Sequence, residues 1–135
     1  PIDIATALNL QIINFATGSN DIPDANKSVL DQAAALMNRV PNVELTVKGF
    51  TDATGDANAN KSLSLKRAQS VADYLVSKGV DPSKLNAVGF GQENPIADNT
   101  TDEGKFKNRR IEFEVTNTET GVQREVTGES VKQTN

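Results

Sequence analysis

The chain has 135 residues, which suits one domain because single hydrophobic cores are commonly built from about 100–150 residues. Its formal net charge of −4 and its dispersed Lys and Arg residues argue against a nucleic-acid-binding protein, since such proteins carry a basic face. The absence of Cys and His excludes thiol nucleophiles, Ser-His-Asp catalysis and the usual zinc ligand sets. The chemistry of any site must therefore be carried out by carboxylates, amides and guanidinium groups.

The sequence contains no segment that approaches the roughly 20 apolar residues needed to span a bilayer. It begins with Pro1-Ile2-Asp3, without a starting Met or a signal peptide, so we interpret it as a mature protein or an excised fragment. Any membrane attachment is expected in a part that this chain does not contain.

The first half of the chain predicts a strand, a helix and a second strand. The segment from Leu8 to Phe15 is rich in Leu and Ile and precedes a turn-forming Thr-Gly-Ser-Asn-Asp cluster, which is typical of a strand. Pro23 suits the first turn of a helix, and Pro41 must end it. The apolar face of this helix is predicted to contain Val29, Ala33, Leu36, Met37 and Val40. Residues 43–50 begin by alternating apolar and polar types, which predicts a half-buried strand.

The second half predicts a helix and two further strands. After a polar loop at 51–59, a second amphipathic helix is expected to end at Lys78-Gly79. A short strand is predicted from Leu85 to Phe90, followed by a long polar connection from Gly91 to Gly104. Arg110 to Thr116 alternates apolar and charged residues and is predicted to be the last strand.

This order of elements, βαβαβ and then β, predicts an α/β fold: a two-layer sandwich with helices packed on a mixed β-sheet. Residues 1–116 are expected to form the domain. Residues 117–135 are predicted to be a polar, weakly ordered tail, because Val122, Val126 and Val131 are too scattered to define an element.

The residues with the clearest chemical meaning are Asp52 and Arg67. Asp52 follows the strand 43–50, and if the next helix begins near Asn60, then Asn60, Ser64 and Arg67 share the face that looks toward the Asp52 loop. An Asp and an Arg held apart match a zwitterionic ligand, with Asp52 for an ammonium group and Arg67 for a carboxylate through two parallel hydrogen bonds. The alternative is that Asp52 caps the loop or helix and Arg67 pairs with it.

Several motifs resemble, in order and spacing, the C-terminal domain of the OmpA family. They are Thr51-Asp52-x-x-Gly55, Asn60-x-x-Leu63-Ser64-x-x-Arg67-Ala68-x-x-Val71, Gly89-Phe90-Gly91 and Asn108-Arg109-Arg110-Ile111-Glu112. That family includes the OmpA tail, the peptidoglycan-associated lipoprotein Pal and the MotB stator domain, which recognise cell-wall peptide stems without cleaving them. The resemblance covers about residues 13–115. It implies a periplasmic, outer-membrane-associated module of a Gram-negative envelope that binds peptidoglycan non-covalently, with no cofactor, metal or nucleic acid.

Carried over by motif, Asp52 and Arg67 are expected to grip the diaminopimelate of the stem peptide. By the same resemblance, Thr51 shapes the end of the strand, Asn60 donates amide hydrogen bonds and Arg109 approaches from the last strand.

Two residues depart from the family pattern. Phe50 stands where the family commonly has His and is expected to pack, whereas Ala16 stands where an Asp is common and removes a polar group from the first loop. Gly18, at the tip of that loop, is still expected to offer a backbone N–H or C=O to the ligand. The alternative for Arg109 and Arg110 is a pair of exposed charges at the start of a strand, where only one can face a given side.

Two other classes of function are open. A carboxylate-based wall hydrolase would need two acidic groups with different pKa values in one cleft. Its candidates, Asp52 and Asp56, lie on one loop without an evident oxyanion or metal partner, so no enzyme is expected. The other alternative is a protein-interaction or dimerisation module of a stator- or secretion-type complex with weak or no wall binding, for which a homodimer is the expected partner.

Overall fold

The computed structural model describes residues 7–8, 10–118, 123–126 and 131–134. The elements follow one another as β1 (Ile13–Asn14), α2 (Asp24–Met37), β2 (Val43–Gly49), α3 (Ala57–Ser77), the 3-10 turn η1 (Pro82–Lys84), β3 (Leu85–Gly89), α4 (Asp102–Asn108), β4 (Arg110–Asn117), β5 (Gln123–Val126) and β6 (Val131–Thr134). None of the helices in this described part has both the length and the apolar character that a bilayer crossing requires.

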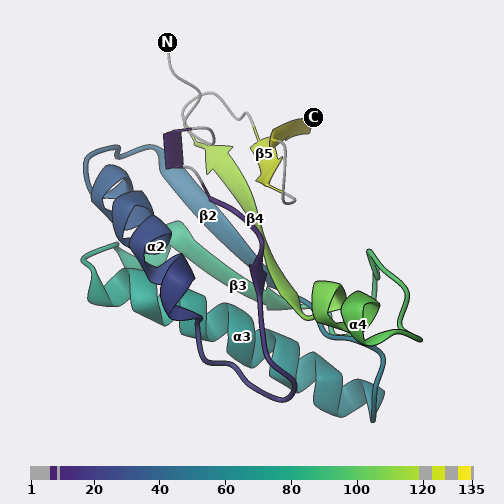
Figure 1. Cartoon of the computed structure of the whole chain (residues 1–135). Helices are drawn as coiled ribbons and strands as arrows, with labels where there is room; N and C mark the ends of the chain where they lie inside the picture. The colour runs from purple at the N-terminus through teal and green to yellow at the C-terminus, as the bar shows by residue number, and fades with distance from the viewer. Residues whose placement is uncertain (1–6, 9, 119–122, 127–130, 135) are drawn as a thin grey trace.

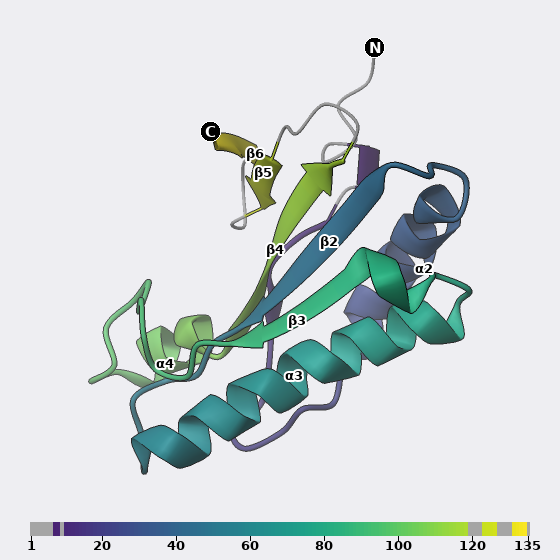
Figure 2. The same cartoon turned by 180° about the vertical axis from the view of Figure 1, so that it is seen from behind.

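The described strands form one mixed sheet in the order β3-β2-β4-β5-β6, with β1 paired to the beginning of β4. Strands β2 and β3 are parallel, because the chain crosses between them through α3, and the other pairs are antiparallel. Helices α2 and α3 run along the sheet, and α4 lies at the end where β3 stops and β4 starts (Figures 1 and 2). The predicted two-layer α/β sandwich on a mixed sheet is confirmed.

The hydrophobic core lies between the sheet and the two long helices. Leu45 of β2 pairs with Val115 of β4, and Val47 pairs with Phe113, so the buried residues of both strands share one face. The helix residues that complete this core are Leu30, Ala33, Ala34 and Met37 of α2 and Ala68, Val71 and Leu75 of α3. The buried face of α2 therefore centres on Leu30, which the predicted face omitted, and Val29 is only half-buried.

Two glycines let α3 lie directly against the sheet. A Cβ atom on Gly49 would overlap the backbone carbonyl of Ser64, and one on Gly89 would lie 2.7 Å from the backbone nitrogen of Leu65. These close contacts fix the middle of α3 over the ends of β2 and β3. Asn60 and Arg67, one turn to either side of Ser64, are thereby held beside the loop that follows β2.

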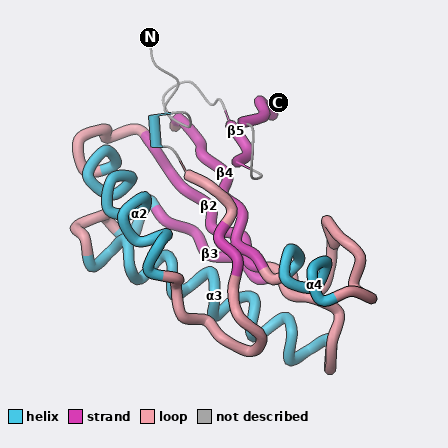
Figure 3. Tube along the Cα trace, viewed as in Figure 1, coloured by secondary structure: helices cyan, strands magenta, loops and turns pink. Residues whose placement is uncertain are grey.

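The prediction of a strand from Leu8 to Phe15 is largely wrong. Among the described residues of this segment, only Ile13 and Asn14 are paired in the sheet, with Ile111 and Arg110, because β5 occupies the rest of the same edge of β4. Leu8 is helical but buried, as are Ile13 and Phe15, so this apolar pattern reflects burial in the core. The loop that follows β1 passes across α3 before it reaches α2 (Figure 3), where Asn20 Nδ2 donates to Ser70 Oγ at 2.8 Å.

Helix α4 lies partly in the segment predicted to be a polar connection. Thr101 caps it by accepting a hydrogen bond from the backbone N–H of Gly104 at 3.0 Å, and acidic residues fill its first turn. The cap and the charges are a helix signal, but the segment has too little apolar periodicity for the pattern to reveal it.

The segment predicted to be a tail without regular elements contains β5 and β6. Val126 pairs with Phe113 and Val131 pairs with Val126, because the far half of β4 offers an open edge. Two of the three scattered valines thus lie in strands, whereas Val122 falls outside the described residues. The domain boundary after residue 116 stays a prediction.

Candidate ligand-binding site

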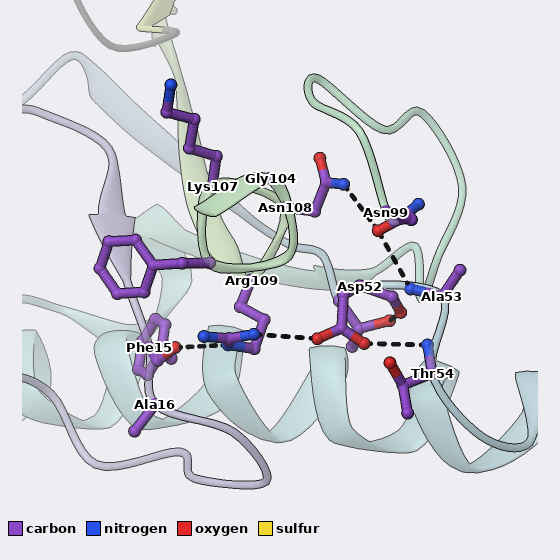
Figure 4. A network of polar contacts seen from close by, with 12 residues as sticks. Phe15, Ala16, Asp52, Ala53, Thr54, Asn99, Gly104, Lys107, Asn108 and Arg109 are labelled. Carbon is purple, nitrogen blue, oxygen red and sulfur yellow. Dashed lines mark hydrogen bonds and ion pairs between the residues drawn. The ribbon is translucent and has the colours of Figure 1, made fainter. Parts of the chain in front are cut away.

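The residues singled out from the sequence meet at the end of the sheet where β2 stops and β4 begins. Phe50 and Arg110 join the two strands there by backbone hydrogen bonds of 2.9 and 3.3 Å. Asp52 extends from the β2 side and Arg109 from the β4 side, and Figure 4 shows them facing each other. Arg67 reaches the same region from α3.

The carboxylate of Asp52 is nearly buried, with 6% of the residue exposed. One oxygen accepts a hydrogen bond from the Thr54 backbone N–H at 2.9 Å, and the other accepts from Arg109 Nη1 at 3.0 Å. Burial raises the pKa of Asp52, but the hydrogen bonds from Thr54 and Arg109 outweigh it and bring the pKa below its ordinary value. Asp52 is therefore a charged group at neutral pH, already occupied on both oxygens.

Arg67 is fully buried and donates hydrogen bonds to three backbone carbonyls. Nε donates to the Ser19 carbonyl at 2.8 Å, Nη1 to Phe50 at 3.2 Å and Nη2 to Ala16 at 3.2 Å. The guanidinium also lies 5.3 Å from the centre of the Phe15 ring. Arg67 thus connects the first loop to the end of β2.

The surroundings of Arg67 lower its pKa but leave the side chain cationic at neutral pH. Burial and the neighbouring charge of Arg109 lower the pKa of Arg67, and Asp52 opposes them, so that the pKa is about 10. The alternative in which Arg67 pairs with Asp52 is wrong, because Asp52 forms its ion pair with Arg109.

Arg109 and Arg110 point to different surroundings. Arg109, with 13% of its side chain exposed, donates from Nε to the Phe15 carbonyl at 2.9 Å and lies 5.6 Å from the centre of the Phe106 ring. Arg110 is buried, pairs with Glu112 at 2.6 Å and lies 3.9 Å above the Phe50 ring. The alternative of two exposed strand-start charges is wrong, because little of the Arg109 side chain is exposed and Arg110 is buried, where it also donates to the Asn94 carbonyl at 2.8 Å.

Thr51 and Asn60 brace the loop that carries Asp52. Thr51 donates from its backbone N–H to the Gly91 carbonyl at 2.7 Å and from Oγ1 to the Asp52 carbonyl at 2.8 Å. Asn60 Nδ2 donates to the Thr54 carbonyl and to Gln92 Oε1, each at 3.0 Å. Asn60 therefore donates its amide hydrogen bonds to the protein itself, in the loop that carries Asp52 and at Gln92.

Gly18 and Phe50 occupy the edge and the base of the site. Gly18 is exposed, has a φ of 69° that favours glycine, and lies between Ala16 and Ser19, whose carbonyls hold Arg67. Phe50 stacks on Phe90 with ring centres 5.1 Å apart, so its predicted packing role is confirmed.

Known proteins share sequence similarity with this domain. The family model described as the OmpA family matches residues 14–109, which include every residue predicted to bind the ligand. The chain belongs to the OmpA family. It is 39% identical over 116 residues to the peptidoglycan-binding protein ArfA of Mycobacterium tuberculosis, covering 84% of this chain and 36% of ArfA. It is 40% identical over 101 residues to the probable lipoprotein YiaD of Escherichia coli, covering 75% of the chain and 46% of YiaD.

Solved structures show the same OmpA-family fold. The peptidoglycan-associated lipoprotein of Burkholderia pseudomallei aligns with a TM-score of 0.75 at 28% identity, over 78% of this chain and 89% of that one. The C-terminal domain of Helicobacter pylori MotB aligns with a TM-score of 0.71 at 29% identity, over 79% and 84%. The chain spans less than half the length of ArfA and YiaD.

This OmpA-family site also contains Asn99, which sequence reasoning missed. Asn108 Nδ2 donates to Asn99 Oδ1 at 2.8 Å, and the same oxygen accepts from the Ala53 backbone N–H at 3.3 Å (Figure 4). The chain of contacts connects α4 to the residue after Asp52. The family motif signals Asn108, but nothing in the polar run around Asn99 marks it.

The hydrolase candidate Asp56 has a structural role in this OmpA-family chain. It caps α3 by accepting a hydrogen bond from the Ala59 backbone N–H at 2.9 Å. Among the described residues, no group of three or more His, Cys, Asp or Glu side chains is placed to hold a metal ion.

Proposed function

We propose that this domain binds peptidoglycan non-covalently through the diaminopimelate of the stem peptide, and so tethers an envelope protein to the cell wall. The observation that carries the proposal is the meeting of one carboxylate and two guanidinium groups, from three elements, at one end of the sheet. Family membership supports it, since one relative is named a peptidoglycan-binding protein and one structural neighbour a peptidoglycan-associated lipoprotein.

In this proposal Asp52 accepts hydrogen bonds from the ligand's ammonium group, and the guanidinium groups attract its carboxylate. Arg109 reaches the carboxylate directly, whereas Arg67 contributes mainly charge and loop position, because it is fully buried. A direct contact from Arg67 requires the loop at 16–19 to release a carbonyl. Thr51 and Asn60 hold the Asp52 loop, and Gly18 offers its backbone at the edge.

The test is calorimetric titration with meso-diaminopimelate, together with co-sedimentation with purified sacculi. Asp52→Asn keeps the shape of the side chain and removes the charge, so it is expected to weaken both interactions at least about tenfold, as loss of a charge-assisted hydrogen bond does. Arg39→Gln removes an exposed charge outside the site and serves as the matched control. Equal binding by wild type and Asp52→Asn would contradict the assignment.

The proposed role is binding without cleavage, in the periplasm and close to the outer membrane. Relatives named as outer membrane porin F and as a probable lipoprotein support this location. Incubation with purified peptidoglycan is expected to recover the domain with the intact wall. Release of soluble muropeptides, abolished in Asp52→Asn, would instead establish a hydrolase.

A second candidate is an interaction module of an envelope complex, with a homodimer as its first partner. The structural likeness to the MotB C-terminal domain favours it. Sedimentation velocity at several concentrations tests it: a concentration-dependent shift toward a dimer, without binding to sacculi, would favour this function over wall anchoring.

A further inference from the structure

We infer that this domain pairs with a second copy of itself through the outer side of α3, in an antiparallel arrangement about a two-fold axis. The inference deepens the second candidate function, because it names the surface on which the homodimer forms. It does not depend on whether the Asp52 site binds peptidoglycan, so the two ideas are tested separately.

The surface is an apolar stripe along the side of α3 that faces away from α2. Leu65, Ala72 and Val76 are spaced by seven and four residues, so they lie within about 40° of one another around the helix. Leu65 is 45% exposed and Val76 is 38% exposed, although both are large apolar side chains. Ser70 and Tyr74, which contact the loop before α2 and α2 itself, lie on the opposite side of the helix. Among the described residues, Leu65 and Val76 are therefore left without a covering element.

The edge of the sheet continues this surface. Strand β3 is the last strand on one side of the described sheet, and Figure 2 shows it next to α3, where the backbone nitrogen of Leu65 lies close to Gly89. The sequence of β3, Leu-Asn-Ala-Val-Gly, contains neither a charged residue nor a proline, which commonly protect an edge strand from pairing. Leu85 and Ala87 pack against the core but stay partly exposed. The uncovered apolar surface thus extends from the α3 stripe to the β3 edge.

Charge selects a second copy of the chain as the partner. Lys66 and Asp73 flank the stripe on its solvent side, and both are exposed. They are seven residues apart, so they occupy nearly the same angular position two turns apart on α3. Gln69 Nε2 donates to Asp73 Oδ1 at 2.9 Å, which holds the carboxylate beside the stripe. When two copies of α3 pack antiparallel with the axis beside Gln69, Lys66 of each copy lies opposite Asp73 of the other.

The two-fold symmetry fixes the orientation of the helices. An isologous interface repeats every contact, so the antiparallel register forms two ion pairs between Lys66 and Asp73. A parallel pair would instead place Lys66 opposite Lys66 and Asp73 opposite Asp73, which is repulsive. The charges on α3 therefore favour the antiparallel pair.

The same register packs the apolar residues of the stripe. With the axis beside Gln69, Leu65 comes opposite the gap between Ala72 and Val76 of the second copy, and the symmetry repeats this contact. The small side chain of Ala72 leaves room for Leu65. Because each copy contributes few large apolar side chains, the dimer is weak and concentration-dependent.

Disulfide cross-linking tests the arrangement directly, because the chain contains no cysteine. Gln69→Cys puts one thiol of each copy beside the axis, so mild oxidation should join two copies. Arg39→Cys, at an exposed position outside the surface, is the matched control. On non-reducing gels, Gln69→Cys should cross-link at least about tenfold faster than Arg39→Cys at the same concentration, since dimerisation raises the effective concentration of its thiols.

Charge reversal tests the register. Lys66→Glu and Asp73→Lys each replace two attractive pairs with two repulsive ones, so each should weaken dimerisation about fivefold or more in sedimentation equilibrium. The double variant Lys66→Glu/Asp73→Lys restores both pairs with the signs exchanged and should dimerise within about twofold of wild type. Circular dichroism verifies that every variant is folded.

Three results would overturn the inference: a wild type that stays monomeric at every concentration, equal cross-linking of Gln69→Cys and Arg39→Cys, or a double variant that dimerises no better than the single variants. Titration with meso-diaminopimelate separates this outcome from a failure of wall anchoring. If wild type binds meso-diaminopimelate but does not dimerise, anchoring stands and the α3 surface is wrong. If Gln69→Cys cross-links but wild type binds neither meso-diaminopimelate nor sacculi, the α3 surface stands and anchoring fails.

Discussion

Replacing Arg67 with Lys should destabilise the fold although the charge is kept. The planar guanidinium reaches three carbonyls, those of Ala16, Ser19 and Phe50, at 2.8–3.2 Å from one buried position. An ammonium group on a shorter, unforked side chain cannot reach all three at once. Each buried carbonyl left without a donor costs about 1–3 kcal/mol, so losing one or two partners should lower the free energy of unfolding by about 2–4 kcal/mol.

Urea unfolding followed by circular dichroism measures this change for wild type, Arg67→Lys and the control Arg39→Lys. With an m value of about 1–3 kcal/mol/M, a loss of about 3 kcal/mol should shift the midpoint by at least about 1 M. Arg39 is exposed, so its substitution should leave the midpoint within error of wild type. An Arg67→Lys midpoint equal to wild type would refute the view that Arg67 clamps the first loop to β2.

Three further predictions follow from single contacts. The folded-state pKa of Asp52 is lowered, so its charge stabilises the fold above about pH 4, and this stabilisation is lost as the pH falls through the lowered pKa. The difference in unfolding free energy between wild type and Asp52→Asn should thus be constant near neutral pH and shrink in acid; a difference that grows in acid contradicts it. Gly49→Ala should cost at least about 2 kcal/mol in urea unfolding, because its Cβ would overlap the Ser64 carbonyl, and a loss below about 1 kcal/mol would argue that α3 shifts freely. Asn108→Ala removes the acceptor of the Ile96 and Ala97 backbone N–H groups, so faster amide hydrogen exchange at those two residues is expected. Unchanged exchange would show that the loop containing Ile96 and Ala97 keeps its conformation without Asn108.

Periodicity predicted the long elements well and the short ones poorly. Apolar and polar residues alternate along β2 and, after the buried Arg110, along β4, because one face of each strand covers the core while the other is more exposed. Strand β1 could not be bounded from sequence, since its length depends on how β5 shares the edge of β4. Helix α4 is short and polar and is defined by its cap and by contacts with the rest of the fold.

The sequence predicted which residues come together but not how they pair. The family resemblance implied that Asp52, Arg67 and Arg109 share one region, and the structure places all three at one end of the sheet, while their role in binding a ligand stays a prediction. The resemblance could not show that Asp52 pairs with Arg109, because that depends on the antiparallel register of β2 and β4. Nor could it show that Arg67 is enclosed by carbonyls, because that depends on the path of the loop at 16–19.

The two site arginines differ in their contacts, and under the proposed function this difference bears on how a ligand would bind. Arg67 is immobilised by backbone acceptors on three sides, so the first loop and the end of β2 are already in place before a ligand arrives. Arg109 is partly exposed, and just one of its contacts involves the carboxylate that a ligand needs. Binding would then require the exchange of one ion pair and little ordering of the backbone, which is the condition under which a few polar contacts give useful affinity.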